Sequence, residues 1–125
     1  MKPTVLIVED DRLSRKLLSE LLTVKGFKIL EAQDGRQGLE QAFEHLPQLI
    51  LMDIQMPEMD GFGAIRALKN DLRTCSITIW ALTAFAMPGD GDRIRACGCD
   101  GYFTKPLDLC ELLARVECHF ENTGQ

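Results

Sequence analysis

Short apolar runs alternate along the chain with longer segments in which apolar residues recur every three or four positions. The short runs are apolar at consecutive positions and rich in β-branched residues, which is typical of strands that are buried on both faces of a sheet. The longer segments have the spacing of amphipathic helices. The pattern predicts five strands, at residues 4–8, 27–32, 48–52, 77–82 and 101–104, each followed by a helix.

Capping and stop signals mark the ends of the predicted helices. Aspartates that can accept a hydrogen bond from a first helical turn precede four of them, and the last one is part of a capping-box pattern with Glu111. These aspartates are Asp11, Asp34, Asp60 and Asp108, and the stop signals are Gly26, Pro47 and Gly98. We expect Leu46 to lie on the apolar face of the second helix and Leu72 on that of the third.

The strict alternation of strands and helices predicts an α/β fold, in which helices cover both faces of a parallel sheet. Right-handed crossovers make such a sheet doubly wound. The 125 residues contain no internal repeat, no low-complexity segment and no interior linker. We therefore expect one domain over residues 1–120, followed by a polar tail at residues 121–125.

Charge and hydropathy narrow the range of partners. The net charge is -5 and no basic stripe is present, so direct binding to nucleic acid is not expected. No apolar stretch reaches the ~18 residues of a membrane span, and the N-terminus does not have the pattern of a signal peptide. We expect no membrane association and a cytoplasmic location.

The five cysteines argue against a disulfide framework, because their number is odd and their spacing shows no paired pattern. Free thiols in a reducing compartment fit better. Cys97 and Cys99 form a C-x-C sequence, not the C-x-x-C of zinc and redox sites, and no second pair of ligands accompanies them. We interpret both as small, buried or half-buried apolar side chains.

Polar residues stand at the ends of four of the five predicted strands. Glu9 and Asp10 follow the first strand, Asp53 the third, Thr83 the fourth and Lys105 the fifth. Ligands of doubly wound folds bind at the carboxyl ends of the strands, so these side chains are expected to converge where a ligand binds. Clustered carboxylates repel one another, and Mg²⁺, which prefers oxygen ligands, relieves that repulsion. An ionised aspartate there can attack phosphorus, with an ammonium and a hydroxyl stabilising the phosphoryl oxygens.

Each of these residues alone also has an ordinary structural explanation. Acidic residues after strands are common helix caps, and Asp11 is expected to be one. A single aspartate after a buried strand is more often a cap or turn residue than a nucleophile, and a Lys-Pro pair is usual in loops. The joint occurrence at four strand ends is what favours a functional site.

Four sequence runs resemble the receiver domain of two-component response regulators. They are LIVEDD at residues 6–11, LILMDIQMPEMDG at 49–61, LTAFA at 82–86 and GYFTKP at 101–106. The resemblance extends from residue 4 to about residue 120 and is greatest to single-domain receivers of the CheY and DivK kind. It implies a flavodoxin- and CheY-like (βα)5 fold, whose five-stranded parallel sheet has the order 2-1-3-4-5.

The resemblance also implies roles for individual residues. Asp53 matches the aspartate that becomes 4-aspartylphosphate, and Lys105 matches the lysine that pairs with a phosphoryl oxygen. The metal site that it implies consists of Glu9, Asp10, Asp53 and the backbone carbonyl of Gln55. The other matched positions are the phosphoryl-stabilising and switch residues Thr83, Ala84 and Tyr102, and Pro106 after a cis peptide bond.

The function implied is that of a signalling switch rather than an enzyme. A histidine kinase or histidine phosphotransfer protein would donate the phosphoryl group to Asp53 with Mg²⁺, for which Mn²⁺ can substitute. The face formed by the fourth helix, the fifth strand and the fifth helix would then bind a downstream protein effector. Three alternatives stay open: a phosphatase of the haloacid-dehalogenase type, a phosphorylation-independent pseudo-receiver, and a receiver that is part of a longer chain.

Overall fold

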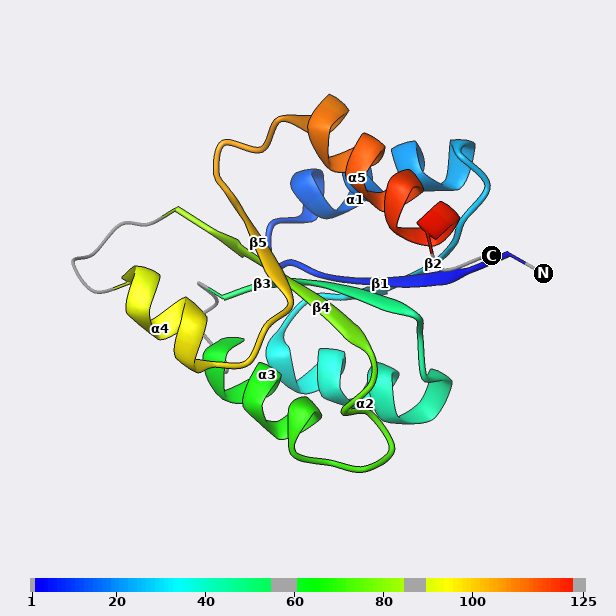
Figure 1. Cartoon of the computed structure of the whole chain (residues 1–125). Helices are drawn as coiled ribbons and strands as arrows, with labels where there is room; N and C mark the ends of the chain where they lie inside the picture. Colours follow the sequence, from blue (N-terminus) through cyan, green and yellow to red (C-terminus); the bar gives the residue numbers. More distant parts are fainter. Residues whose placement is uncertain (1, 55–60, 85–89, 123–125) are drawn as a thin grey trace.

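The computed structural model describes residues 2–54, 61–84 and 90–122, which form a doubly wound α/β domain (Figure 1). The parallel sheet has the order β2-β1-β3-β4-β5, which confirms the predicted fold class. The strands are β1 (Thr4–Val8), β2 (Lys28–Ala32), β3 (Leu49–Asp53), β4 (Thr78–Thr83) and β5 (Gly101–Thr104). The helices are α1 (Arg12–Val24), α2 (Gly35–His45), α3 (Gly61–Lys69), α4 (Asp90–Ala96) and α5 (Leu109–Asn122).

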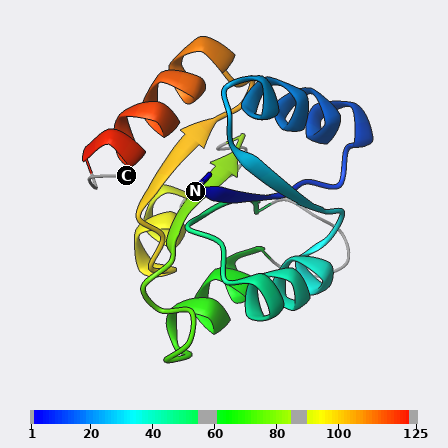
Figure 2. The ribbon, with the colours of Figure 1, turned by 90° about the vertical axis from the view of Figure 1, so that its right-hand side faces the viewer.

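Helices cover the sheet on both faces, with α1 and α5 on one side and α2, α3 and α4 on the other (Figures 1 and 2). Successive residues of a strand point to opposite faces. In β1, Leu6 and Val8 therefore enter the core beneath α2 and α3, whereas Val5 and Ile7 enter the core beneath α1 and α5. This double burial explains why the central strands are apolar at consecutive positions.

Predicted helix boundaries agree with the structure where a cap defines them. Asp11 and Asp34 accept hydrogen bonds from the backbone N–H groups of Ser14 and Gln37, at 3.0 and 2.8 Å. Asp108 accepts one from Glu111 at 3.1 Å. Gly26 and Gly98 have φ of 100° and 90°, which favours glycine after a helix. Asp60, the predicted cap of α3, lies outside the described residues.

Two leucines predicted on apolar helix faces are solvent-exposed instead. Leu46 is the C-cap of α2 in a left-handed conformation, with φ of 48°, and its side chain is 51% exposed. Leu72 is 94% exposed, because α3 ends at Lys69. Beyond that point the Thr74 hydroxyl donates to the Leu68 carbonyl at 2.6 Å, so the chain turns away before Leu72 reaches the core.

The last helix is longer than the apolar pattern indicates, since α5 runs through Asn122 and so includes two residues of the predicted polar tail. Its buried side is formed by Leu112, Val116 and Phe120, as the spacing predicts. The Phe120 ring lies 5.3 Å from that of Phe27, between ring centroids. This contact fixes the end of α5 beside the start of β2.

Candidate functional site

The carboxyl ends of β1, β3, β4 and β5 form one edge of the sheet, here called the carboxyl edge, and it brings the predicted site residues together. Glu9 and Asp10 follow β1, and Asp53 is the last residue of β3. On β4, Leu82 is the register partner of Asp53, so Thr83 lies one position further along the edge. Thr83 in turn pairs with Thr104, the residue before Lys105.

Lys105 forms ion pairs with the carboxylates that follow β1 and end β3. Its Nζ lies 2.9 Å from Asp53 Oδ2 and 3.2 Å from Glu9 Oε1. Both carboxylate side chains are only 1% exposed, whereas the lysine side chain is 31% exposed. Buried charges of like sign repel strongly, so the shared ammonium is what allows the two carboxylates to lie together.

Three carboxylates at the carboxyl edge can hold a metal ion. Glu9, Asp10 and Asp53 each place an oxygen within 4.8 Å of the other two, with Asp10 exposed and the others buried. Carboxylate oxygens are the ligands that Mg²⁺ prefers, and an exposed member leaves room for the waters that Mg²⁺ retains. The donor set therefore fits this ion. Gln55, the fourth predicted ligand, lies outside the described residues.

Burial controls the protonation of Glu9. Its removal from water raises the pKa of Glu9 to about 7, and the neighbouring Asp53 carboxylate adds to that rise. Burial also disfavours the charged form of Lys105, but hydrogen bonding and attraction to Asp53 and Glu9 outweigh it and raise the pKa of Lys105. The ammonium therefore stays charged while Glu9 is close to half-protonated at neutral pH.

A glycine sets how closely α3 approaches Asp53. A Cβ atom at Gly61 would lie 2.4 Å from the Ile54 Cα and 2.9 Å from the Asp53 carbonyl oxygen. Such distances are too short for any side chain, so only glycine lets the first turn of α3 pack against the end of β3. The Ile54 N–H donates to the Leu82 carbonyl at 3.1 Å, which extends the pairing of β3 and β4 past Asp53.

Arg15 also holds the site in place, and the sequence analysis did not identify it. Its Nη1 donates to the backbone carbonyl of Glu9 at 2.9 Å, and its Nε pairs with Glu31 Oε1 at 3.1 Å. Lys16 Nζ and the Ser19 hydroxyl also bind Glu31. The available signal was Glu31 itself, because a charged residue within an apolar strand requires a partner.

Asp11 belongs to α1 rather than to the metal ligands. Hydrogen bonds from Ser14 lower the pKa of Asp11, consistent with its role as the N-cap. Its own backbone N–H donates to Glu9 Oε2 at 3.2 Å. The cap thus fixes the start of α1 and one oxygen of Glu9 together, which confirms the structural interpretation of Asp11.

The remaining predicted positions lie along β4 and β5. Thr83 is fully buried, Ala84 is exposed directly after it, and the Thr83 carbonyl accepts from the Lys105 N–H at 2.7 Å. The peptide bond between Lys105 and Pro106 is cis, as predicted. Tyr102 pairs with Ala81 in mid-strand, is 46% exposed and stands outside the cluster of carboxylates and lysine.

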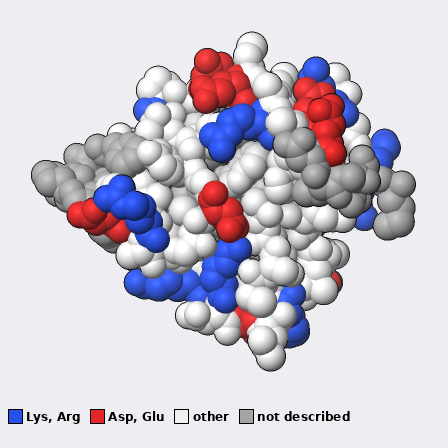
Figure 3. All heavy atoms as spheres, in the orientation of Figure 1, with Lys and Arg blue, Asp and Glu red and all other residues white. Residues whose placement is uncertain are grey.

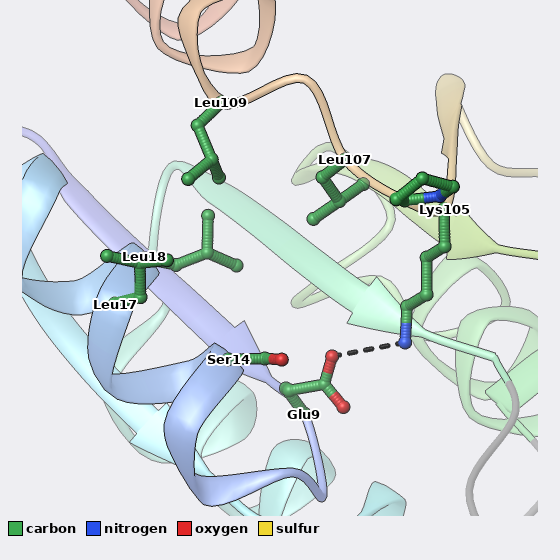
Figure 4. A pocket seen from close by; sticks show the side chains of 8 residues that line it. Glu9, Ser14, Leu17, Leu18, Lys105, Leu107 and Leu109 are labelled. Carbon is green, nitrogen blue, oxygen red and sulfur yellow. Dashed lines mark hydrogen bonds and ion pairs between the residues drawn. The ribbon is translucent and has the colours of Figure 1, made fainter.

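A cavity of about 250 Å³ opens between α1 and the segment that joins β5 to α5 (Figure 4). One end is polar, where Glu9 and Lys105 form their ion pair, and the remainder is mostly apolar. The apolar lining consists of Leu17, Leu18, Pro106, Leu107 and Leu109. A partner seated in this cavity would lie directly beside the carboxylate cluster.

On the face shown in Figure 3, acidic and basic side chains are interspersed. Within residues 2–54, 61–84 and 90–122, no helix combines the length and the apolar character needed to cross a membrane.

Comparison with known proteins identifies the family. The model of the response regulator receiver domain matches residues 5–117, and the chain therefore belongs to this family of two-component signalling domains. It is 40% identical over 119 residues to the polar-differentiation response regulator DivK of Brucella anthropi. That alignment covers 95% of this chain and 97% of the relative, and the DivK of Brucella ovis gives the same values.

Solved structures agree with the family assignment. Chemotaxis protein CheY4 of Vibrio cholerae has a TM-score of 0.86 at 28% identity, over 94% of this chain and 98% of that one. A receiver domain of a sensor histidine kinase from Pseudomonas aeruginosa has a TM-score of 0.84 at 28% identity, over 94% and 96% of the two chains. The latter structure has a magnesium ion coordinated in its active-site cleft.

The raised pKa of Glu9 predicts a pH dependence of stability in metal-free buffer with EDTA. Between the ordinary pKa near 4.5 and the native value of about 7, the folded chain binds more protons than the unfolded chain. The free energy of unfolding should therefore fall as pH rises from 5 to 7, by an amount on the order of 2 kcal/mol that Glu9→Gln removes. Urea unfolding at each pH measures the free energy of unfolding, and Glu20→Gln is the control for loss of an exposed glutamate. If the free energy of unfolding of wild type and of Glu9→Gln changed with pH in the same way, the raised pKa would not belong to Glu9.

Proposed function

We propose that the chain is a phospho-accepting response regulator of a two-component phosphorelay, in which Asp53 receives a phosphoryl group from a phosphohistidine. The observation that carries this proposal is the contact between Lys105 Nζ and Asp53 Oδ2 at 2.9 Å, with Glu9 and Asp10 beside the same buried carboxylate. An acceptor of this kind needs an ionised oxygen nucleophile and fixed positive charge next to it.

Phosphoryl transfer uses the residues of the carboxyl edge in a defined way. An oxygen of Asp53 attacks phosphorus, a new O–P bond forms, the N–P bond of the phosphohistidine breaks, and the imidazole leaves with that electron pair. Lys105, already within hydrogen-bonding distance of Asp53, then pairs with an oxygen of the transferred group. The Thr83 hydroxyl donates to a second oxygen, and the small side chain of Ala84 leaves space for the group.

Glu9, Asp10, Asp53 and the carbonyl of Gln55 are the residues that would hold Mg²⁺ or, in its place, Mn²⁺. The ion supplies positive charge to phosphoryl oxygens that carry increasing negative charge during transfer. Two observations support this assignment: one oxygen of each of the three carboxylates lies within 4.8 Å of the others, and the related receiver domain from Pseudomonas aeruginosa has a magnesium ion in its active-site cleft.

We propose that phosphorylation of Asp53 changes the surface of the domain, and that the domain does not turn over a substrate as an enzyme does. When Thr83 moves toward the phosphoryl group, Tyr102 turns into the space that Thr83 leaves. The face formed by α4, β5 and α5 is thereby altered for a downstream protein effector. The position of Tyr102 on β5, where it is 46% exposed, supports this role, because a side chain that is not enclosed in the core can change its position. Free thiols at all five cysteines favour a cytoplasmic setting.

A phosphatase of the haloacid-dehalogenase type is disfavoured by one sequence feature. Its nucleophile is followed two residues later by a second acid, and the corresponding position here is Gln55. A pseudo-receiver is disfavoured because the acidic residues and Lys105 lie together at the carboxyl edge.

Substitution of the acceptor tests the proposed function. With acetyl phosphate and Mg²⁺, we expect intact-protein mass spectrometry to show one added phosphoryl group on wild type. The phosphorylated fraction of Asp53→Asn should be at least about 100-fold smaller, because an amide is a poor nucleophile. Asp108→Asn is the matched control, since asparagine preserves the cap of α5. Undiminished phosphorylation of Asp53→Asn, or multiple turnover of small phosphate esters by wild type, would contradict the proposal.

The cavity beside the site is proposed to receive the protein that carries the phosphohistidine. Its leucine lining leads from solvent to Lys105 and Glu9, and within that lining Leu17 is 46% exposed. One turn earlier on α1, Leu13 is 80% exposed. A protein donor that buries these leucines would bring its imidazole to the open end of the carboxylate cluster.

Leu17→Ala should therefore separate two kinds of donor. Transfer from a phosphorylated histidine kinase, chosen as the most active toward wild type in a phosphotransfer screen, should slow about tenfold because apolar contact area is lost. Transfer from acetyl phosphate, which needs no docking, should stay within about twofold. Leu72→Ala, at a leucine that is 94% exposed and not part of the cavity, is the control. Equal slowing with both donors would show that Leu17 acts on the site itself and not on docking.

A further inference from the structure

Two cysteines meet at the turn between α4 and β5. Cys97 is 3% exposed, Cys99 is half-buried, and Gly98 between them has φ of 90°. The two thiols point at the same acceptor: Cys97 Sγ lies 3.0 Å and Cys99 Sγ lies 3.5 Å from the Ile94 carbonyl oxygen. The left-handed glycine thus curls the chain so that two side chains two residues apart converge.

The turn that carries these thiols is anchored on its far side. Asp100 donates its backbone N–H to the Ile79 carbonyl at 2.7 Å, and Asp100 Oδ2 accepts from the Ile79 N–H at 2.9 Å. Lys69 Nζ pairs with the same carboxylate at 2.8 Å. The side-chain carbons of Lys69 pack against Gly98, at 3.6 Å from the position of a Cβ there. The convergence of the sulfurs is therefore part of the packed structure.

The pairing also changes the acidity of the thiols. A hydrogen bond from Cys99 lowers the pKa of Cys97 to about 6, and the same hydrogen bond raises the pKa of Cys99. The pair therefore loses its first proton more readily than an isolated thiol, and the thiolate is the form that reacts with oxidants. Cys99 is the member that an oxidant can reach, and Cys97 lies behind it in the core.

We propose that Cys97 and Cys99 are a redox-active dithiol, which a peroxide converts to an intramolecular disulfide. Cys99 passes its proton to the Cys97 thiolate as the Cys99 sulfur attacks one oxygen of hydrogen peroxide, the O–O bond breaks, and the departing hydroxide takes up a proton to leave as water. Cys97 then attacks the resulting sulfenic sulfur, the S–S bond forms, and a second water leaves. Two thiols and one peroxide give one disulfide and two waters. This inference does not depend on the phosphorylation of Asp53.

The other cysteines differ from this pair. Cys75, Cys110 and Cys118 are exposed; Cys75 lies in the segment between α3 and β4, and Cys110 and Cys118 lie on α5. The oxidised form would also lose two S–H donors to the Ile94 carbonyl, so the last turn of α4 is the place where oxidation changes the structure. The earlier interpretation of Cys97 and Cys99 as buried and half-buried side chains is confirmed, and their convergence is what that interpretation did not include.

The experiment uses the full chain with Cys75→Ser, Cys110→Ser and Cys118→Ser combined, so that only the pair remains. After treatment with hydrogen peroxide, the chain is denatured, alkylated with N-ethylmaleimide and weighed by mass spectrometry. We expect both alkylatable thiols to disappear together in a monomer that has lost two hydrogens, and a reductant to restore both. Adding Cys99→Ser should leave Cys97 alkylatable, because the thiol that the oxidant reaches is absent.

The same chain in concentrated urea is the test of geometry, since it keeps the C-x-C sequence and loses the fold. Disulfide formation should be at least about tenfold slower there than in the native chain, measured at the same pH. Equal rates in the two states would overturn the proposal, as would disulfide-linked dimers as the main product, or oxidation of one thiol while the other stays alkylatable.

Discussion

The Lys105 ammonium between the carboxylates of Asp53 and Glu9 is the interaction on which the site depends. Both carboxylates are almost completely shielded from water, and without a cation their mutual repulsion and desolvation would oppose this arrangement. With Lys105 in place, the two carboxylates can lie together at the carboxyl edge, and under the proposed function the same positive charge would pair with the oxygens of an incoming phosphoryl group.

The fold supplies what this interaction requires. Parallel strands end at one edge, so residues 9, 53 and 105, far apart in the chain, become neighbours without any long loop. Gly61 allows α3 to press against the end of β3, and Arg15 ties the Glu9 backbone to Glu31 on β2. The two cores on either side of the sheet keep these strand ends in register. Rigid elements thus position a small set of charged atoms.

The parts of this structure that sequence reasoning could predict are those encoded by local pattern. Consecutive apolar positions identify buried strands, and aspartates before helices identify caps such as Asp11 and Asp34. The order of the strands came from family resemblance, because periodicity does not encode which strands are neighbours. Leu72 was misplaced because helical spacing continues in the sequence after the backbone has left the helix. Arg15 was missed because its two contacts depend on how α1 packs against β2.

The central claim, that Lys105 is the counter-ion of a buried carboxylate pair, is tested most directly by urea unfolding of Lys105→Met in EDTA and in saturating Mg²⁺. We expect a loss of about 2 kcal/mol in EDTA at pH 7.5, and a larger stabilisation by Mg²⁺ than wild type shows, because the ion replaces the missing charge. Lys25→Met, at an exposed lysine paired with Glu117, controls for removal of a surface charge. Wild-type stability of Lys105→Met in EDTA, with an unchanged response to Mg²⁺, would contradict the account.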